Sequence, residues 1–198
     1  SCGMSNLEEI SETLQCFNEF TNYPIILMLT TSEYPTKPED VNLLKLKTLS
    51  KTFPNIPLGY SDHTQGNLAA SIAVGFGAKV FEKHFTDDNN REGPDHKFAM
   101  NPNTWREMVD RANEVYQSLG NGLKIIEENE KETAIVQRRG LRFTIALPVG
   151  HILEKEDLFP LRPLDPDGIP PYDIVNLVGR KLNRQVKVDD YIRREDIE

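Results

Sequence analysis

The chain has 198 residues, of which 38% are hydrophobic and 27% charged, a globular balance with enough length for one large domain or two small ones. Its longest aliphatic run covers residues 25–29, whereas a membrane span needs roughly 20 apolar residues. Acidic residues outnumber basic residues 31 to 23, which weighs against a nucleic-acid partner because phosphate binding needs a basic surface. The composition therefore predicts a globular chain that binds neither nucleic acid nor membrane.

The first residues and the cysteines predict a cellular compartment. Ser1, Cys2 and Gly3 begin a stretch without the basic and apolar regions of a secretory leader. Cys2 and Cys16 are too few for a disulfide framework, so their simplest interpretation is a pair of reduced thiols. On these grounds we expect a cytoplasmic protein.

An amphipathic helix is predicted almost at the first residue. Ser5 and Glu8 fit a capping box, in which each side chain accepts a hydrogen bond from the other residue's backbone N–H. Cys16 is expected near the apolar face of this helix, as part of the core. Because such a helix needs a preceding layer to pack on, we expect the chain to be the C-terminal part of a longer protein. The apolar residues at helical spacing are Leu7, Ile10, Leu14 and Phe17.

Three strand–loop–helix units follow, the pattern of a parallel α/β protein. Gly77 is a terminator for the second helix of these units, while Asn101 and Pro102 are an N-cap and a first residue for the third. No G-x-G-x-x-G run accompanies the strands, so a dinucleotide-binding sheet is disfavoured. A segment of a (β/α)8 barrel fits better, and three strands cannot close a barrel. The expected strands cover residues 25–29, 57–61 and 79–85, and the expected helices cover 39–53, 68–76 and 102–119.

The sequence changes character after Gly122. A glutamate-rich stretch comes first and is predicted to be a solvated linker with some helical tendency. Six of the 13 prolines lie between Pro148 and Pro171, with short strands expected at 141–145 and 185–188. The predicted boundaries are 1–122 for the barrel segment, 123–138 for the linker and 139–198 for a compact, β-rich domain.

Two histidines form a candidate metal site. His63 lies two residues after the second expected strand, and His84 lies at the end of the third. In a parallel barrel neighbouring strand ends meet at the carboxyl face, so we expect the two imidazoles to converge. Converging imidazoles bind divalent metals. The alternative is that each histidine only forms a hydrogen bond to the barrel rim, and the sequence leaves both interpretations open.

Polar side chains near the same strand ends are further candidates. Asp95 ends a Gly-Pro-Asp turn that would hold its carboxylate over the rim, although a plain turn is the alternative. Ser32 and Tyr34 follow the first strand, where a solvent-facing turn is the simpler interpretation. Ser1 and Ser61 are hydroxyls at strand ends that suit phosphate contact without being specific for it.

Several motifs occur together in this chain: TSEYP at residues 31–35, GYSDHT at 59–64, EKHF at 82–85 and EGPDH at 92–96, then ILEKEDL at 152–158 and LRP at 161–163. The set resembles the sialic acid synthase family, whose members make N-acetylneuraminate and related nonulosonic acids from phosphoenolpyruvate. The later motifs are similar to that family's C-terminal antifreeze-like (SAF) domain. The resemblance implies an α/β fold: the C-terminal portion of a (β/α)8 TIM barrel, followed by a small β-rich SAF domain of the β-clip type.

The resemblance also assigns roles at the metal. It implies that His63 and His84 bind a manganese or magnesium ion, and that Asp95 is a catalytic carboxylate near the metal and the sugar. The family's general acid–base glutamate and its phosphoenolpyruvate-binding lysines lie on strands that precede those of this chain. We therefore expect the 198-residue chain to be inactive alone.

The substrate-binding assignments follow from the same resemblance. Ser1 and Ser61 match hydroxyls that contact phosphoenolpyruvate, and Tyr34 matches a residue of the acylamino-sugar pocket. Ser32 stands where some members have asparagine. Arg162 matches an arginine that reaches from the SAF domain into the barrel of a partner subunit. A homodimer with exchanged SAF domains is therefore implied.

The implied activity is that of an N-acetylneuraminate (sialic acid) synthase, which condenses phosphoenolpyruvate with N-acetylmannosamine and releases phosphate. A sister synthase for legionaminate, pseudaminate or a spore-coat sugar is the first alternative, because the metal-site motifs do not distinguish these sugars. A non-catalytic carbohydrate-binding fragment is the second alternative, which the lack of the early strands favours.

Overall fold

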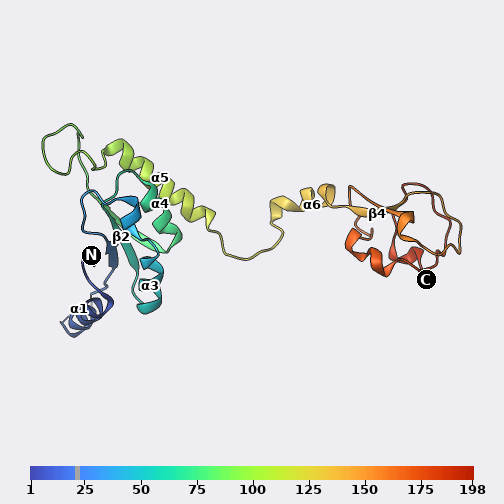
Figure 1. The fold of residues 1–198 in the computed structure, drawn as a ribbon, viewed down its shortest axis with the longest axis horizontal. Helices are drawn as coiled ribbons and strands as arrows, with labels where there is room; N and C mark the ends of the chain where they lie inside the picture. The colour runs from blue at the N-terminus through green and yellow to red at the C-terminus, as the bar shows by residue number, and fades with distance from the viewer. Residues whose placement is uncertain (21–22) are drawn as a thin grey trace. The chain divides into compact units, whose positions relative to one another are not determined.

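The computed structural model describes residues 1–20 and 23–198, and the chain divides into two compact units, Ser1–Gly122 and Leu123–Glu198. The first unit is built on a parallel sheet (Figure 1). Its strand order is β1 (Leu27–Thr30), β2 (Leu58–Asp62) and β3 (Ala78–Lys83). The parallel strand–helix pattern predicted from the sequence is confirmed.

The helices of the first unit cover and flank this sheet. Asn101 caps the last of them, because its side-chain oxygen accepts hydrogen bonds from the backbone N–H groups of Asn103 and Thr104, each at 3.0 Å. Gly77, with φ of 94°, turns the chain directly after the helix that precedes it. Both terminal signals were correctly predicted. The described helices are α1 (Leu7–Phe20), α2 (Pro38–Val41), α3 (Lys45–Thr52), α4 (Leu68–Gly75) and α5 (Pro102–Ser118).

The predicted capping box of α1 is wrong by one residue. Instead of Ser5 and Glu8, the reciprocal pair is Asn6 and Glu9. The N–H of Asn6 donates to Glu9 Oε2 at 2.8 Å, and the N–H of Glu9 donates to Asn6 Oδ1 at 3.0 Å. Asparagine is as good an N-cap as serine, so residue type alone does not distinguish the Asn6–Glu9 pair from the Ser5–Glu8 pair.

Two further predictions fail for geometric reasons. Cys16 is exposed rather than part of the core, because it lies about 200° around the helix from Leu14. Only Ile10 and Leu14 of α1 are buried. The helix expected over 39–53 is two helices, α2 and α3, because Asn42 takes a left-handed conformation (φ 48°) that breaks the hydrogen-bond ladder.

The two faces of the sheet have different chemistry. One face packs against the helices and forms the core. The other face carries a polar row, since register aligns Thr30 of β1 with Ser61 of β2 and Ser61 with Glu82 of β3. This row lies one residue before the strand ends of β2 and β3. The buried core residues include Ile10, Leu27, Leu29, Leu46, Leu49, Leu58, Tyr60 and Ala73.

The second unit has its own core and little regular structure. It contains one antiparallel pair, β4 (Gly140–Phe143) with β5 (Leu158–Leu161). The strand expected over 185–188 is reduced to an isolated bridge between Leu147 and Val186, because the chain turns at Asp189 (φ 66°). Its helical turns are η1 (Glu128–Glu130), α6 (Lys131–Gln137), η2 (Lys155–Asp157), η3 (Pro171–Asn176) and η4 (Arg194–Asp196). Its fully buried side chains include Leu141, Phe143, Leu153, Leu182, Val186 and Ile192.

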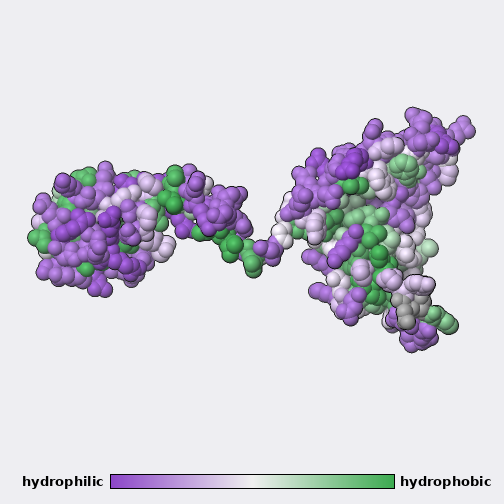
Figure 2. Space-filling model, turned by 180° about the vertical axis from the view of Figure 1, so that it is seen from behind, coloured by the Kyte–Doolittle hydropathy of each residue, from purple (hydrophilic) through white to green (hydrophobic). Residues whose placement is uncertain are grey.

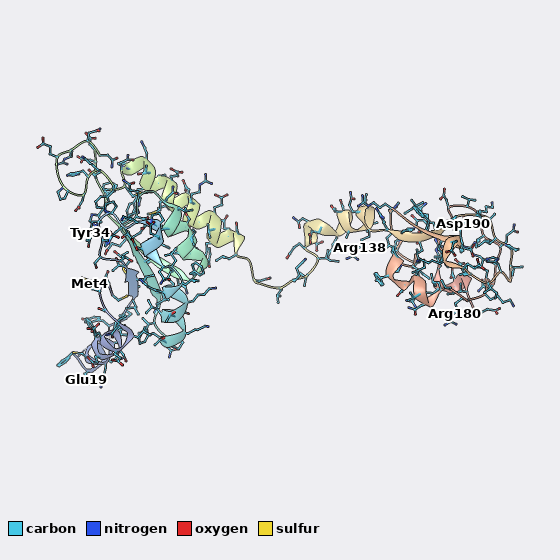
Figure 3. All side chains as sticks on the ribbon, viewed as in Figure 1. Met4, Glu19, Tyr34, Arg138, Arg180 and Asp190 are labelled. Carbon is cyan, nitrogen blue, oxygen red and sulfur yellow. The ribbon has the colours of Figure 1, made fainter. Side chains whose placement is uncertain are left out.

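The surface of each unit mixes polar and apolar side chains (Figure 2). On the first unit Tyr34 projects from the loop after β1, and on the second unit Arg138, Arg180 and Asp190 are among the charged side chains (Figure 3). Exposed apolar side chains of the first unit include Ile26, Leu68, Ile72 and Val80. Within the described residues, every helix is too short or too polar to cross a membrane.

Candidate active site

The two candidate histidines lie side by side at the sheet edge. β2 ends at Asp62 and β3 ends at Lys83, so His63 and His84 are the next residues of neighbouring strands. Their ring centroids are 5.2 Å apart and their planes nearly perpendicular, at 85°. The Tyr34 ring lies 4.3 Å from that of His63 and 5.5 Å from that of His84. The structure thus brings together a tyrosine and two histidines predicted separately.

Each imidazole has a protein oxygen close to its Nδ1 atom. His63 Nδ1 lies 2.7 Å from the carbonyl oxygen of Thr31, which only accepts, so Nδ1 carries the hydrogen. His63 therefore keeps the lone pair on Nε2, the arrangement in which a protein oxygen orients a metal-binding histidine. His84 Nδ1 lies 3.3 Å from Asp95 Oδ2, a close contact without the alignment of a hydrogen bond.

The described residues supply few ligands for a metal ion. Within residues 1–20 and 23–198, no group of three or more His, Cys, Asp or Glu side chains is arranged to hold a metal ion. The two histidines supply two nitrogen ligands, and nitrogen ligands suit first-row divalent ions. The residues present therefore fit a divalent ion that takes its other ligands from outside this set.

The carboxylate of Asp95 is held at the edge of the cluster. Its side chain is half-exposed, and its backbone carbonyl accepts from the N–H groups of Phe98 and Ala99. Phe98 in turn packs against His84, with ring centroids 5.2 Å apart. Asn89 ties the loop closed by donating to the carbonyls of His96 and Ala99, each at 2.8 Å. The loop therefore holds one carboxylate oxygen beside His84, and Asp95 presents its exposed side to solvent.

A buried ion pair lies directly before both histidines. Lys83 Nζ donates to Asp62 Oδ2 at 2.8 Å and to the carbonyl of Thr64 at 2.6 Å, and both charged side chains are 1% exposed. Asp62 Oδ1 also accepts from the N–H of Thr64 at 2.8 Å and from Tyr60 Oη at 3.2 Å. This network ties the end of β2 to the end of β3 and so fixes the separation of the histidines. Burial, followed by the charge of Asp62, raises the pKa of Tyr60.

Sequence reasoning missed this pair, although a signal was present. Each charged residue immediately precedes a candidate histidine, in the tripeptides Ser-Asp-His at residues 61–63, where the second predicted strand ends, and Glu-Lys-His at residues 82–84, within the third. Residues at matching positions of neighbouring parallel strands point to the same side of the sheet. Opposite charges at those two positions therefore predict a cross-strand ion pair.

The predicted serines have different surroundings. Ser61 donates its hydroxyl hydrogen to Glu82 Oε1 at 2.6 Å. Ser32 lies against the first residues of the chain, and its side chain occupies the space that a Cβ on Gly3 would need. Ser1 is exposed, and in the described structure no hydrogen bond joins it to Ser61 or the histidines. Its segment runs along β1, with the Cys2 N–H donating to the carbonyl of Met28 at 3.0 Å.

Arg162 belongs to the second unit. It directly follows β5, and its side chain is exposed. Among the described residues, its guanidinium has no hydrogen bond and no ion pair. The side chain is therefore available to a ligand, and its role stays a prediction.

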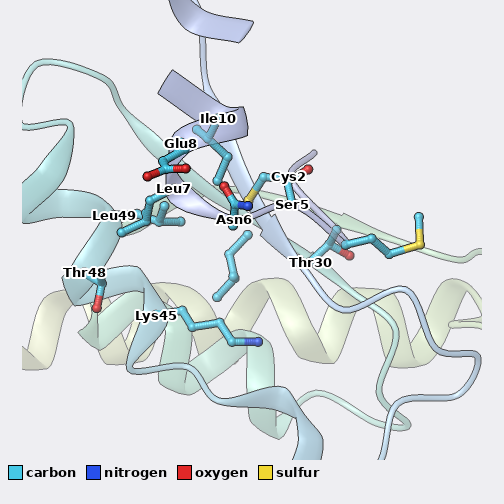
Figure 4. A pocket seen from close by; sticks show the side chains of 12 residues that line it. Cys2, Ser5, Asn6, Leu7, Glu8, Ile10, Thr30, Lys45, Thr48 and Leu49 are labelled. Atoms are coloured by element: carbon cyan, nitrogen blue, oxygen red, sulfur yellow. The ribbon is translucent and has the colours of Figure 1, made fainter. Parts of the chain in front are cut away.

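The first unit also contains a cavity of about 690 Å³ beside α1 and α3, shown in Figure 4. Its lining includes Cys2, Asn6, Lys45 and Thr48, and none of the predicted metal, catalytic or substrate-binding residues. Burial raises the pKa of the Cys2 thiol, so this thiol is less reactive than an exposed one. The cavity is thus separate from the histidine cluster.

In enzymes with (β/α)8-type folds, the active site lies at the carboxyl ends of the parallel strands. The histidine and tyrosine side chains of this chain lie at that edge of its sheet. The model of the NeuB family matches residues 1–124, and the model of the SAF domain matches residues 138–198. The chain therefore belongs to the NeuB family and carries a SAF domain. The resemblance to sialic acid synthases and the predicted fold class are both confirmed.

Curated relatives extend over nearly all of this chain. The N,N'-diacetyllegionaminic acid synthase of Legionella pneumophila is 37% identical over 100% of the chain and 56% of the relative. The human N-acetylneuraminate-9-phosphate synthase is 34% identical over 98% of the chain and 54% of the relative. The chain thus spans little more than half the length of these relatives.

Solved structures agree with the fold. The N-acetylneuraminic acid (sialic acid) synthetase of Leptospira borgpetersenii, solved in complex with citrate, is 30% identical with a TM-score of 0.61. That match covers 66% of this chain and 45% of the other. A spore coat polysaccharide biosynthesis protein E from Chromobacterium violaceum, described as putative in its structure title, shares the fold, with a TM-score of 0.66 at 22% identity over 99% of this chain and 59% of the other.

Proposed function

We propose that this chain works as part of a nonulosonic acid synthase that converts phosphoenolpyruvate, an N-acylated hexosamine and water into a nonulosonic acid and phosphate. N-acetylmannosamine is the first candidate sugar, with N-acetylneuraminate as product. The observation that carries the proposal is the cluster of His63, His84, Tyr34 and Asp95 in a chain of the NeuB family. Because the chain belongs to this family, a synthase reaction is the simplest explanation of the cluster.

The histidines would hold a divalent ion, manganese or magnesium, through their Nε2 atoms. Such an ion, when bound, supplies a Lewis acid for the aldehyde oxygen of an open-chain sugar. Asp95 lies beside His84 Nδ1, where its carboxylate would favour the metal-binding tautomer of that ring. Its exposed side accepts hydroxyl hydrogens of the sugar, which is the catalytic role we propose for it.

Tyr34 and the serines would orient the two substrates. Tyr34 packs on His63 and forms a wall of the sugar pocket, with Ser32 nearby on the same loop. Ser61 and Ser1 would contact the phosphate. Because Ser61 has a single hydroxyl hydrogen and gives it to Glu82, it must rotate to donate to a phosphate oxygen. Holding both substrates in this way converts a bimolecular encounter into an oriented one.

Arg162 would complete the sugar site from the SAF domain. Its exposed guanidinium offers five N–H donors to the acyl carbonyl and hydroxyl groups of the sugar. We propose a cytoplasmic homodimer in which the SAF domain of one copy serves the site of the other. This arrangement predicts that sites are shared between chains.

A product assay tests the function. The chain is fused behind the part of the Legionella pneumophila relative that precedes the matched region, and is incubated with Mn²⁺, phosphoenolpyruvate and each of several acylamino-hexoses. We expect phosphate release and a nonulosonic acid detected by mass spectrometry, with N-acetylmannosamine the best substrate. A preference for a legionaminate or pseudaminate precursor would identify a sister synthase. No product with any sugar, from a folded fusion and an active parent enzyme, would refute the proposal.

The chain alone provides the companion measurement. We expect no product from residues 1–198 under the same conditions, because three strands leave open sheet edges and an unfilled barrel interior. Turnover by the unfused chain would show that the remaining strands are not needed.

A further inference from the structure

Arg142 of β4 and Tyr191 form a pair that reaches the backbone next to Arg162. The guanidinium carbon of Arg142 lies 4.1 Å from the centroid of the Tyr191 ring. Arg142 Nη2 donates to Tyr191 Oη at 2.6 Å and to the carbonyl of Arg162 at 3.5 Å. Tyr191 Oη then donates to the carbonyl of Pro163 at 3.2 Å. Two side chains distant in sequence therefore hold two consecutive carbonyls.

The rest of this loop is also tied to the second unit. The Leu164 N–H donates to the carbonyl of Ile135 at 3.3 Å, and Asp165 pairs with Arg193 at 3.5 Å. The Leu141 N–H donates to the carbonyl of Ile169 at 2.8 Å. From 162 to 169 the loop is held by backbone or side-chain contacts. The guanidinium of Arg162 is the exception, since it is exposed and unpaired among the described residues.

The character of Arg142 argues against a purely stabilising role. It lies between Leu141 and Phe143, both buried, on a short strand. Its Nε is buried and has no hydrogen-bond partner among the described residues. An aliphatic side chain at this half-buried position would avoid that cost. Such an aliphatic side chain could not make the contacts with Tyr191 and with the carbonyl of Arg162.

We propose that Arg142 and Tyr191 are positioning residues that fix the backbone at Arg162 and so aim its guanidinium at the acylated sugar. The inference rests on the proposed function of Arg162. The direction of a side chain follows from its backbone, so a held carbonyl limits the directions in which Arg162 leaves the surface. A preoriented arginine binds with a smaller loss of conformational entropy, and the effect falls on sugar affinity.

Tyr191→Phe in the fused enzyme tests the pair, because it removes the hydroxyl and keeps the ring beneath Arg142. We expect the sugar KM to rise about two- to tenfold, with kcat and the phosphoenolpyruvate KM unchanged. Arg142→Met should act similarly, and Arg142→Lys should recover part of the loss. Tyr172→Phe, at a tyrosine of η3 that is 81% exposed, is the matched control and should change nothing.

A double variant separates positioning from general stability. In an Arg162→Ala background, Tyr191→Phe should cause no further rise in the sugar KM, because the pair acts only through Arg162. If the sugar KM of the double variant rises by the product of the two single-variant changes, the proposal is overturned.

An NMR measurement on the 198-residue chain separates this inference from the proposed function. Tyr191→Phe should lower the backbone order parameters at Arg162 and Leu164 from rigid values near about 0.85 toward flexible ones below about 0.6. Unchanged order would overturn the positioning proposal, whether or not the fused enzyme is active. Lost order in an enzyme that makes no product would support positioning and refute the synthase.

Discussion

Replacing Lys83 with methionine leaves a buried charge without its partner. The lysine side chain is 1% exposed and makes two short contacts, with Asp62 Oδ2 and the Thr64 carbonyl. Methionine fills a similar volume and provides no donor. Asp62 keeps its hydrogen bonds from the Thr64 N–H and Tyr60 Oη, but its negative charge is no longer balanced.

The structure gives the size of the effect. Removing one member of a buried ion pair costs about 3–5 kcal/mol, and the two hydrogen bonds left on Asp62 point to the lower end, about 3 kcal/mol. Urea slopes for small domains are about 1–3 kcal/mol per molar, so the unfolding midpoint should fall by at least about 1 M. The double variant Lys83→Met with Asp62→Asn should regain most of this loss, since the amide oxygen still accepts and no charge remains.

Fluorescence of Trp105 is the assay, because the sequence contains a single tryptophan and it lies in the first unit. Lys79→Met is the matched control: the same substitution at an exposed lysine of β3 should leave the midpoint unchanged. A decrease of less than about 0.5 M in the urea midpoint of Lys83→Met would contradict the predicted cost of the unpaired charge. So would a double variant whose midpoint is no higher than that of Lys83→Met.

Three other predictions concern the metal, the sugar and pH. His63→Ala and His84→Ala should each weaken Mn²⁺ binding at least about tenfold by calorimetry, whereas His151→Ala in the second unit should not; equal affinities in all variants would contradict the metal site. Arg162→Ala in the fused enzyme should raise the sugar KM about tenfold or more and leave the phosphoenolpyruvate KM unchanged, because a charge-assisted hydrogen bond contributes about 1.5–3 kcal/mol; an equal change in both constants would contradict a sugar contact. The pKa of Tyr60 is raised in the folded state, so the unfolded chain loses this proton first and stability should fall as pH rises through about 10; Tyr60→Phe should show a shallower fall between pH 9.5 and 11, and an unchanged slope would contradict the shift.

Local sequence signals predicted the parts of the fold that depend on local physics. The Asn101 cap, the turn at Gly77 and the alternation of strands and helices involve residues close in sequence. The meeting of His63 and His84 was predictable for a different reason, because parallel strand ends share one edge of the sheet.

Other features were beyond such signals. Helical periodicity identifies an apolar stripe but not how much of it a neighbour covers, and Cys16 lies outside the covered part. The break at Asn42 depends on one residue taking a left-handed conformation, which asparagine tolerates without requiring it. The contacts of Arg142 and Tyr191 join residues 49 apart, and no local pattern specifies them.

The proposed metal site is tested most directly by an anomalous diffraction map of the chain crystallised with Mn²⁺. We expect one strong manganese peak within bonding distance of Nε2 of both His63 and His84. The Nδ1 atoms of the two rings should still face Thr31 and Asp95. A peak bound elsewhere, or a map with no manganese at the two histidines, would contradict the assignment of this cluster as the active site.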